Sequence, residues 1–451
     1  MIQTNPKNTR LKFFFPLFFL IFFSSFSFCD VNDDLVKAIK NNDYKNFEIA
    51  LKNGADPNAK DAYSSVLLLT LSNSQEQMAI DLISKGANIN DGYSVSTNAI
   101  FLAVNNKLSK ASNLLINLGA DITQLRQDGI NILMMAVNRD MQEVALNIIS
   151  KKKLDINAVD KAGDTALSLA LNKNYLEMAK ILYKHGAKPR NMFEAIPIKD
   201  IESVKNFIED TRQLMSIDKE GNTPLHTAYI YSNYEIAHLI LKKKSINIDS
   251  ENKNHLTASM IAAMNNDLKL ISLAMGYGAD ILIPDRNGLT PLMYAVFYRN
   301  YELIWKILDY NKHAAFSIDN DGSSAFSYAV AYRDKKICQK LLKINGVMNQ
   351  RKAKSPLSIA IANLDENMVE LLLKNDVAIN VKDCFDLTPL SMAIKMNSPK
   401  MVKFLLAKGA DPQLTDRDGK TPLYYAQIYG NQDILDLLDT NTERHVDYYK
   451  K

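Results

Sequence analysis

The sequence predicts an all-α repeat fold, a solenoid of about thirteen stacked helix–turn–helix units. The first observation is an alanine that returns about every 33 residues along almost the whole chain. The second is that a turn precedes this alanine and an apolar stretch follows it in copy after copy. A fixed period of this size indicates one small unit that is repeated and stacked, because no single unit can bury its apolar face alone.

These alanines, which we call the ladder, define the register of the repeats. They are Ala38, Ala103, Ala136, Ala170, Ala195, Ala228, Ala262, Ala295, Ala329, Ala360, Ala393 and Ala426. Most neighbouring pairs are 33 or 34 residues apart, and the first interval of 65 residues has the length of two repeats. The interval from Ala170 to Ala195 is only 25 residues, which indicates a shortened repeat.

A turn and a Thr-Pro-Leu sequence stand before the ladder alanine. The fullest copy reads Gly-Asn-Thr-Pro-Leu-His-Thr-Ala over 221–228, and related copies recur at 288–292, 386–390 and 419–423. Threonine before proline can cap a helix, and proline costs no hydrogen bond in the first helical turn. A helix is therefore expected to begin at each of these prolines.

A second apolar stretch follows the ladder alanine and ends in Leu-Leu and Gly-Ala-Asp, most clearly at 119–121 and 409–411. The leucines form the inner stripe of an amphipathic helix, and the glycine suits a left-handed position after its last turn. Together these features resemble the ankyrin repeat family over roughly residues 31–440. The resemblance implies an ankyrin solenoid whose units have two antiparallel helices and a short β-turn finger.

The short interval in the ladder divides the array into two parts. Residues 31–190 are expected to form N-terminal ankyrin repeats, and residues 191–440 C-terminal ankyrin repeats that start with a shortened unit. The missing residues are those of the turn, so this unit is expected to lack its finger. The deletion is either a discontinuity in the stack, as a bend or a seam between two sub-arrays, or a tolerated deletion in a loop with no hinge. The tail 441–451 has no apolar period and is expected to be flexible.

Residues 1–29 have the order of a secretory signal peptide. Lys7, Arg10 and Lys12 come first, a phenylalanine-rich stretch follows over 13–23, and small serines come last. The apolar stretch is short for a membrane span. We therefore expect an exported protein that resides in the periplasm or cell envelope or is secreted. The Lys-, Asn- and Ile-rich composition is typical of a bacterial protein from an AT-rich genome.

The end of this segment leaves three alternatives open. Cleavage after Ser27 or Cys29 would release the repeats, whereas an uncleaved segment would act as an anchor. Lipidation of Cys29 would also tether the chain, although Phe28 stands where a lipoprotein signal prefers a small residue. In each case a membrane is expected to be contacted only through this segment.

The charge balance argues against a nucleic-acid binder that relies on bulk charge. The formal net charge is +4, and without residues 1–29 the chain has 51 basic and 50 acidic residues, or +1. Binding to the phosphate backbone would need a clear basic excess. We therefore expect no nucleic-acid partner.

The sequence offers no catalytic constellation, metal site or cofactor site. The six histidines are spread over several repeats, and no His/Cys group has the spacing of a zinc site. A phosphate-binding glycine loop and a serine nucleophile elbow are also missing from the sequence. His226 completes the Thr-Pro-Leu-His sequence, and its ring is expected to bond to the turn of the next repeat. We expect no enzymatic activity.

Tyrosines recur three residues after the ladder alanine in the C-terminal repeats, where the N-terminal repeats have polar residues. The resemblance places this position at the exposed end of the first helix, which together with the finger tips binds partners in ankyrin-repeat proteins. The candidate partner-binding residues are Tyr231, Tyr298, Tyr332 and Tyr429 in the row, and Phe385 and Arg286 at finger tips. Tyrosine suits an interface because it combines a large contact area with a polar tip. The alternative is that the rings pack between repeats and only stabilise the stack.

The sequence therefore predicts an exported scaffold that binds protein partners through the C-terminal repeats. The sequence is also compatible with two alternative functions. One is a membrane-tethered structural protein of the cell envelope, and the other is a secreted effector directed at host proteins.

Overall fold

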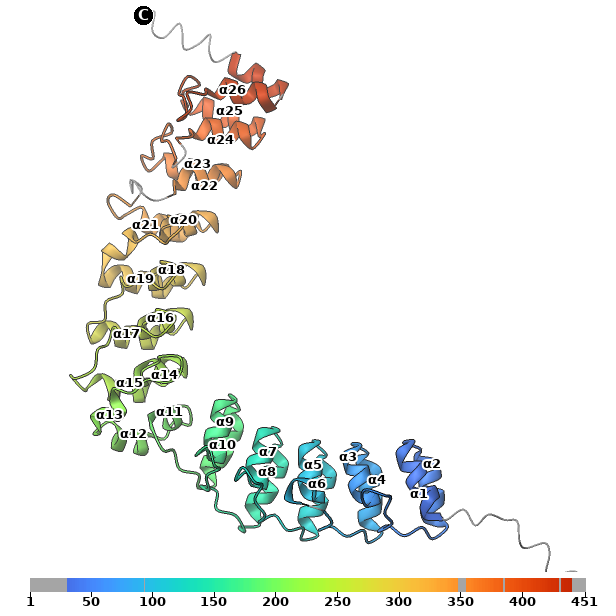
Figure 1. The fold of residues 1–451 in the computed structure, drawn as a ribbon. Helices are drawn as coiled ribbons and strands as arrows, with labels where there is room; N and C mark the ends of the chain where they lie inside the picture. Colours follow the sequence, from blue (N-terminus) through green and yellow to red (C-terminus); the bar gives the residue numbers. More distant parts are fainter. Residues whose placement is uncertain (1–30, 93, 348–353, 384–385, 430, 440–451) are drawn as a thin grey trace, which may run out of the picture. The chain divides into compact units, whose positions relative to one another are not determined.

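The computed structural model describes residues 31–92, 94–347, 354–383, 386–429 and 431–439. These residues form thirteen successive pairs of helices with no extended strand among them, as the repeat pattern predicts (Figure 1). The chain divides into two compact units, the N-terminal unit up to Lys188 and the C-terminal unit from Pro189. The predicted signal segment, Cys29, Phe385 and the predicted flexible tail lie outside the described residues.

The N-terminal unit contains five helix pairs, which we number as repeats 1–5. They are α1 (Val31–Lys40) with α2 (Tyr44–Lys52), α3 (Val66–Ser72) with α4 (Glu76–Ser84), α5 (Ala99–Asn105) with α6 (Ser109–Asn117), α7 (Ile132–Asn138) with α8 (Gln142–Ser150), and α9 (Ala166–Asn172) with α10 (Leu176–Lys184). A short 3-10 helix, η1 (Val95–Thr97), precedes α5.

The C-terminal unit contains repeats 6–13. They are α11 (Met192–Ala195) with α12 (Ile201–Phe207), α14 (Pro224–Ile230) with α15 (Tyr234–Leu241), α16 (Ala258–Met264) with α17 (Leu268–Gly276), α18 (Pro291–Phe297) with α19 (Tyr301–Tyr310), α20 (Ala325–Ala331) with α21 (Lys335–Leu341), α22 (Pro356–Ala362) with α23 (Glu366–Leu373), α24 (Pro389–Lys395) with α25 (Pro399–Ala407), and α26 (Pro422–Tyr429) with the helix 432–439. Two short helices, α13 (Thr211–Leu214) and η2 (Lys312–Phe316), follow α12 and α19.

The ladder alanines lie where successive first helices pack together. Within each unit the first helix of one repeat contacts the first helix of the next, as α16 contacts α14 and α18. Ala38 is 4% exposed and the later ladder alanines are completely buried. A small side chain at this position lets the two backbones approach closely. One apolar core therefore continues through the C-terminal unit from Met192 to Leu438.

Threonine replaces alanine at one rung of the ladder. Thr70 occupies in α3 the place that Ala103 has in α5, which explains the interval of 65 residues in the sequence. Its side chain is fully buried, and its Oγ1 donates a hydrogen bond of 2.8 Å to the carbonyl of Leu67. The hydroxyl finds its partner inside its own helix, so the stack tolerates it.

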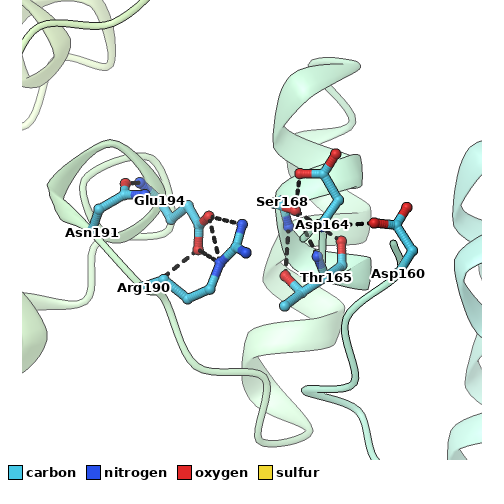
Figure 2. Close-up of polar contacts among 7 residues, drawn as sticks. All are labelled: Asp160, Asp164, Thr165, Ser168, Arg190, Asn191 and Glu194. Carbon is cyan, nitrogen blue, oxygen red and sulfur yellow. Dashed lines mark hydrogen bonds and ion pairs between the residues drawn. The ribbon is translucent and has the colours of Figure 1, made fainter. Parts of the chain in front are cut away.

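Side-chain caps fix the start of many of the first helices, although Thr290 before α18 makes no such bond. In α14 the Oγ1 of Thr223 accepts from the backbone N–H of His226, and Pro224 follows as the first helical residue. In α9 the cap is reciprocal, because the N–H of Thr165 donates to Ser168 Oγ at 2.8 Å and the N–H of Ser168 donates to Thr165 Oγ1 at 3.1 Å (Figure 2). These caps satisfy backbone donors that a helix leaves open.

In repeats 1–12 a left-handed residue follows the first helix, four positions after the ladder alanine or, in repeat 2, after Thr70. Arg299, Arg333 and Leu364 occupy it with φ of 53°, 57° and 51°. The next backbone N–H then returns to the carbonyl of the ladder alanine, as Asn300 does to Ala295 at 2.9 Å. This reversal satisfies a helix-end carbonyl and starts the second helix.

The fingers are turns organised by an aspartate and joined to one another. Asp285 Oδ1 accepts from the N–H groups of Asn287 and Leu289 at 2.9 and 2.8 Å. The finger of repeat 9 meets that of repeat 10 through a hydrogen bond of 3.0 Å from the N–H of Asn320 to the carbonyl of Asn287. Gly288 lies at this contact with φ of +84°, and a Cβ there would come within 2.7 Å of the next finger.

A second polar ladder joins the loops that follow the second helices. Asn58 accepts from the N–H of Asn88 at 2.8 Å and donates to the carbonyl of Gly86 at 3.2 Å. Asn157 makes the same two bonds to Lys188 and Gly186 in the next repeat. Each such asparagine therefore bridges two repeats with one side chain.

Repeat 6 departs from the pattern at its start. Residues 185–191 connect α10 to α11, whereas residues 151–165 connect α8 to α9. A charged pair closes the first turn of α11, where Arg190 Nη2 lies 2.7 Å from Glu194 Oε1 and the Arg190 N–H donates to Glu194 Oε2 at 2.9 Å (Figure 2). Asn191 caps α11 by accepting from the backbone N–H of Glu194 at 3.0 Å, and the charged pair, in which Glu194 is only 6% exposed, adds a second contact to this first turn. The interpretation of this shortened repeat as a hinge stays a prediction.

Candidate functional site

The tyrosine row lies at the ends of the first helices. Tyr231, Tyr298 and Tyr332 are the C-cap residues of α14, α18 and α20, and Tyr429 is the last residue of α26. A C-cap residue points away from the helix axis just before the left-handed turn, so its side chain reaches the surface.

The five candidate residues that the structure describes differ in their exposure. Tyr298 and Tyr429 are 47% and 46% exposed, whereas Tyr231 and Tyr332 are half-buried. Arg286 is exposed at the tip of its finger, and its carbonyl accepts from Asn320 Nδ2 of the next finger. Whether any of them binds a partner stays a prediction.

Four aromatic rings gather at the ends of α18 and α20. Phe297 meets Tyr298 edge-on with 5.2 Å between ring centroids, and it meets Tyr332 edge-on at 5.9 Å across the repeat boundary. Tyr332 in turn stacks on Tyr328 at 6.3 Å. Such pairs hold the rings in a fixed geometry. Phe297 is nevertheless 57% exposed, so the cluster presents an apolar surface to solvent.

A neighbouring set of tyrosines has a structural role. Tyr294 and Tyr328 directly precede their ladder alanines, and their hydroxyls donate to Asp285 Oδ2 at 2.7 Å and to Asp319 Oδ2 at 2.5 Å. Tyr425 makes the same bond to Asp416. The other oxygen of each aspartate holds the backbone of the finger. These tyrosines therefore attach the first helix to its own finger.

The carboxylate contact changes the ionisation of these phenols. The hydrogen bond to Asp416, together with burial, raises the pKa of Tyr425 to about 12. Burial and then the hydrogen bond to the aspartate raise the pKa of Tyr294 and of Tyr328 further. The phenols therefore stay protonated as donors across the physiological pH range.

Tyr229 belongs to the core and not to the surface. It is completely buried, and its hydroxyl donates to the carbonyl of Leu270 at 3.1 Å. Tyr229 directly follows its ladder alanine, Ala228, whereas Tyr294 and Tyr328 directly precede theirs.

The exposed apolar surface is wider than the tyrosine row. We define the C-terminal stripe as the three residues that lie two, three and four positions after each ladder alanine of repeats 7–13. The described members are Ile230–Ser232, Met264–Asn266, Phe297–Arg299, Ala331–Arg333, Ala362–Leu364, Lys395–Asn397 and, in repeat 13, Ile428 and Tyr429 alone. Ile230, Phe297, Leu364, Met396 and Ile428 are each between 43% and 58% exposed.

The equivalent positions of the N-terminal unit have no apolar residue. They are Lys40–Asn42, Ser72–Ser74, Asn105–Lys107, Asn138–Asp140 and Asn172–Asn174. Large exposed apolar side chains in a contiguous array mark interaction surfaces on soluble proteins. The two units therefore share one backbone pattern at these positions but present different chemistry.

Polar residues at this position connect neighbouring repeats. Asn106 Nδ2 donates to the carbonyl of Leu71 at 2.7 Å, and Asn363 Nδ2 donates to that of Ala331 at 3.3 Å. Asparagine therefore caps the helix end of the preceding repeat. A tyrosine cannot donate in this way from its ring and presents that ring to solvent or to a neighbouring ring instead.

Two arginines lie along the stripe beside the aromatic cluster. Arg299 Nη2 donates to the carbonyl of Tyr332 at 3.1 Å, and Arg333 Nη2 donates to that of Asn363 at 2.7 Å. Each guanidinium crosses to the next repeat and is held there. A guanidinium has five N–H donors, so one carbonyl bond leaves most of them for other acceptors.

His226 has the structural role that the sequence predicts. Its Nδ1 lies 2.7 Å from Thr223 Oγ1, and its Nε2 lies 2.8 Å from the carbonyl of Leu256 in the next repeat. Burial lowers the pKa of this imidazole, which favours the neutral ring. The bond to the next repeat is confirmed.

The described residues contain neither a metal-binding cluster nor a helix that could span a membrane. Among residues 31–439, leaving out the undescribed positions, no cluster of His, Cys, Asp and Glu has a metal-binding arrangement. The described helices are also all too short or too polar to cross a membrane.

Comparison with known families agrees with the repeat geometry. A family model for ankyrin repeats in three copies matches residues 100–193 and, in overlapping windows, 244–447, and a single-repeat model matches residues 220–250. These matches cover more than half of the chain. The chain belongs to the ankyrin repeat family. Ankyrin repeats are in general scaffolds for protein–protein interaction.

The relatives of this ankyrin-repeat chain come from different kinds of organism. It is 28% identical over 60% of its length to an ankyrin repeat protein of Rickettsia felis, of which it covers 72%. It is 26% identical over 63% of its length to the human transient receptor potential cation channel subfamily A member 1, of which it covers 24%. The crystal structure of the Bcl-3 ankyrin repeat domain matches 49% of this chain at 25% identity, with all of that domain covered and a TM-score of 0.44.

The match spans only part of several relatives. It covers 24% of the human channel subunit and 52% of the mouse B-cell lymphoma 3 protein homolog, to which this chain is 25% identical over half of its own length. The common feature is the repeat array itself.

Proposed function

We propose that this protein is an exported ankyrin-repeat scaffold that binds partner proteins through the C-terminal stripe and catalyses no reaction. The observation that carries the proposal is the contrast between the two units. Equivalent helix ends are polar throughout repeats 1–5 but carry Tyr, Phe, Ile, Leu and Met in repeats 7–13. Since the stack is the same in both, the apolar residues are not needed to build it.

The geometry of the stripe supports contact with a protein. Tyr298 and Phe297 are exposed yet held by edge-on ring contacts, so they would lose little side-chain entropy on binding. Aromatic anchors flanked by arginine are enriched at the centres of protein interfaces. The repeat boundaries supply several such anchors along one line.

Export is proposed from the basic, apolar and small-residue order of residues 1–29. A membrane-tethered envelope protein remains the second candidate, because Cys29 and the apolar stretch before it fit an anchor as well as a cleaved signal. Cell fractionation of the producing cells separates them. We expect the chain in the periplasm or the medium, and recovery in the detergent phase would favour the tethered form.

Affinity capture with matched variants tests the binding surface. The full chain is compared with a Tyr298→Ala/Tyr332→Ala variant. The control is an Arg139→Ala/Lys173→Ala variant, which changes the residues three positions after two ladder alanines of the N-terminal unit. Partners identified by mass spectrometry should be lost with the tyrosine variant and kept with the control. Circular dichroism and urea unfolding confirm that the variants fold. Equal capture by all three proteins would refute the site.

A further inference from the structure

The chemistry of the C-terminal stripe restricts the kind of partner that fits it. Its charged members are Arg299, Arg333 and Lys395, and its sequence contains no Asp or Glu. Asp267, Asp334 and Asp365 directly follow stripe residues, and the carboxylate of each caps the second helix of its repeat. A partner with acidic groups would therefore find complementary charges and no acidic residue within the stripe itself.

The two arginines are positioned in advance. Hydrogen bonds to the carbonyls of Tyr332 and Asn363 fix Arg299 and Arg333 across two successive repeat boundaries. Asp365 lies 3.9 Å from Arg333 Nε, so its carboxylate offsets part of that charge. Arg299 is consequently the stronger candidate for a carboxylate of the partner, which a guanidinium can bind through two parallel N–H groups.

The spacing of the repeats matches an extended chain. Packed helices lie about 8–10 Å apart, and one turn of an extended polyproline-II chain, which has three residues, advances about 9 Å. A chain in this conformation that runs along the stripe would therefore place every third side chain on the same face, opposite a new repeat.

We propose that the C-terminal stripe binds an extended acidic segment of a partner protein whose apolar side chains recur at every third residue. This inference rests on the proposed function, which it narrows to one partner chemistry. The apolar side chains would contact Phe297, Tyr298 and Leu364 and their neighbours in the stripe, and the acidic side chains between them would meet Arg299 and Arg333.

Synthetic peptides test this inference directly on the full chain. Fluorescein-labelled 15-residue probes are titrated by fluorescence anisotropy. The first has leucine at every third position with aspartate and serine between, and the second has the same residues in shuffled order. A third replaces aspartate by lysine, and a fourth is a helix former with leucine at every seventh position. The first should bind at least about tenfold more tightly than each of the others.

Charge variants then locate the contact. Arg299→Gln should weaken binding of the first peptide on the order of tenfold, the size expected for a hydrogen bond to a charged group. The matched control Lys107→Gln, at the same position in the N-terminal unit, should leave it unchanged. Failure of the first peptide to bind, equal binding of the shuffled or lysine peptide, or tighter binding of the helical peptide would overturn the inference. If partner capture still depended on Tyr298 and Tyr332, the proposed function would survive that result.

Discussion

At the scale of single residues, similar tyrosines have different roles that depend on their distance from the ladder alanine. Those one position before it bind the finger aspartate, as Tyr328 binds Asp319. Those three positions after it are exposed or pack on other rings, as Tyr298 does. The role of a tyrosine in this array therefore follows from its register.

Removing one phenol should separate these two roles. We expect Tyr328→Phe to lower the free energy of unfolding by about 1–2 kcal/mol, because Asp319 is buried and loses a hydrogen-bond donor. Tyr298→Phe serves as the matched control and should change it by less than about 0.5 kcal/mol. Urea unfolding of both variants provides the measurement. Equal losses would contradict the assignment of Tyr328 to the finger contact.

The buried histidine gives a pH dependence with a defined sign. Burial lowers the pKa of His226 from its usual value of 6.5, so the unfolded chain binds the proton more readily than the folded one. The stabilisation is complete above pH 6.5 and is lost as the pH falls from there through the folded pKa.

We therefore expect the wild-type protein to lose more stability between pH 7.5 and 5.5 than His226→Gln does. Urea unfolding at both pH values measures this difference. His185→Gln, which changes an exposed histidine, should behave like the wild type. An identical pH dependence in the His226 variant would show that another group titrates in this window.

At the scale of the helices, the ladder explains why the array tolerates some residues and not others. The small rung lets successive first helices approach, and Thr70 keeps this spacing because its hydroxyl bonds to Leu67 within the same helix. The structure contains no space for a longer side chain at a rung, since Ala295 is completely buried between α16 and α20.

Substitutions at two rungs test the packing. Thr70→Ala should change the free energy of unfolding by less than about 1 kcal/mol, because it restores the common residue and removes a satisfied hydroxyl. Ala295→Leu should lower it by about 1–3 kcal/mol or more through overpacking. Denaturant unfolding checks both. A leucine variant as stable as the wild type would mean that the helices can separate at the rung without cost.

The repeat sequence predicted these elements well because each signal is local. The Thr-Pro pair, the ladder alanine and the Gly-Ala-Asp end each determine the backbone of the residues around them. The Tyr328–Asp319 bond and the Asn157 bridge join residues from different turns or repeats. A single copy gives no hint of them, although the recurring separation of nine residues between these aspartates and tyrosines was a signal that could have been read.

At the scale of the whole molecule, the stripe was predicted only in part. Counting three positions from each ladder alanine found Tyr298 and Tyr332 but missed Leu364, which lies one position further along its repeat. The reason is that the left-handed turn brings three successive residues to the surface together. The arginine contacts across repeat boundaries could be found only from the folded chain.

The two units differ in surface chemistry while sharing one backbone pattern, and this separates folding from binding. Because neighbouring repeats supply the stability of a solenoid, the residues at the helix ends are free to vary. We therefore expect a polar replacement of the stripe, such as Phe297→Ser with Leu364→Ser, to preserve the helical signal in circular dichroism while abolishing partner capture.

Site-specific photo-crosslinking tests the location of the binding surface most directly. A benzophenone amino acid is placed at Phe297 in the stripe or at Asn172, the matching position of the N-terminal unit, and the producing cells are irradiated. We expect a covalent product with a partner protein from position 297 and none from position 172. A product from position 172 alone, or none from either position while capture by the wild type persists, would show that the partner binds elsewhere.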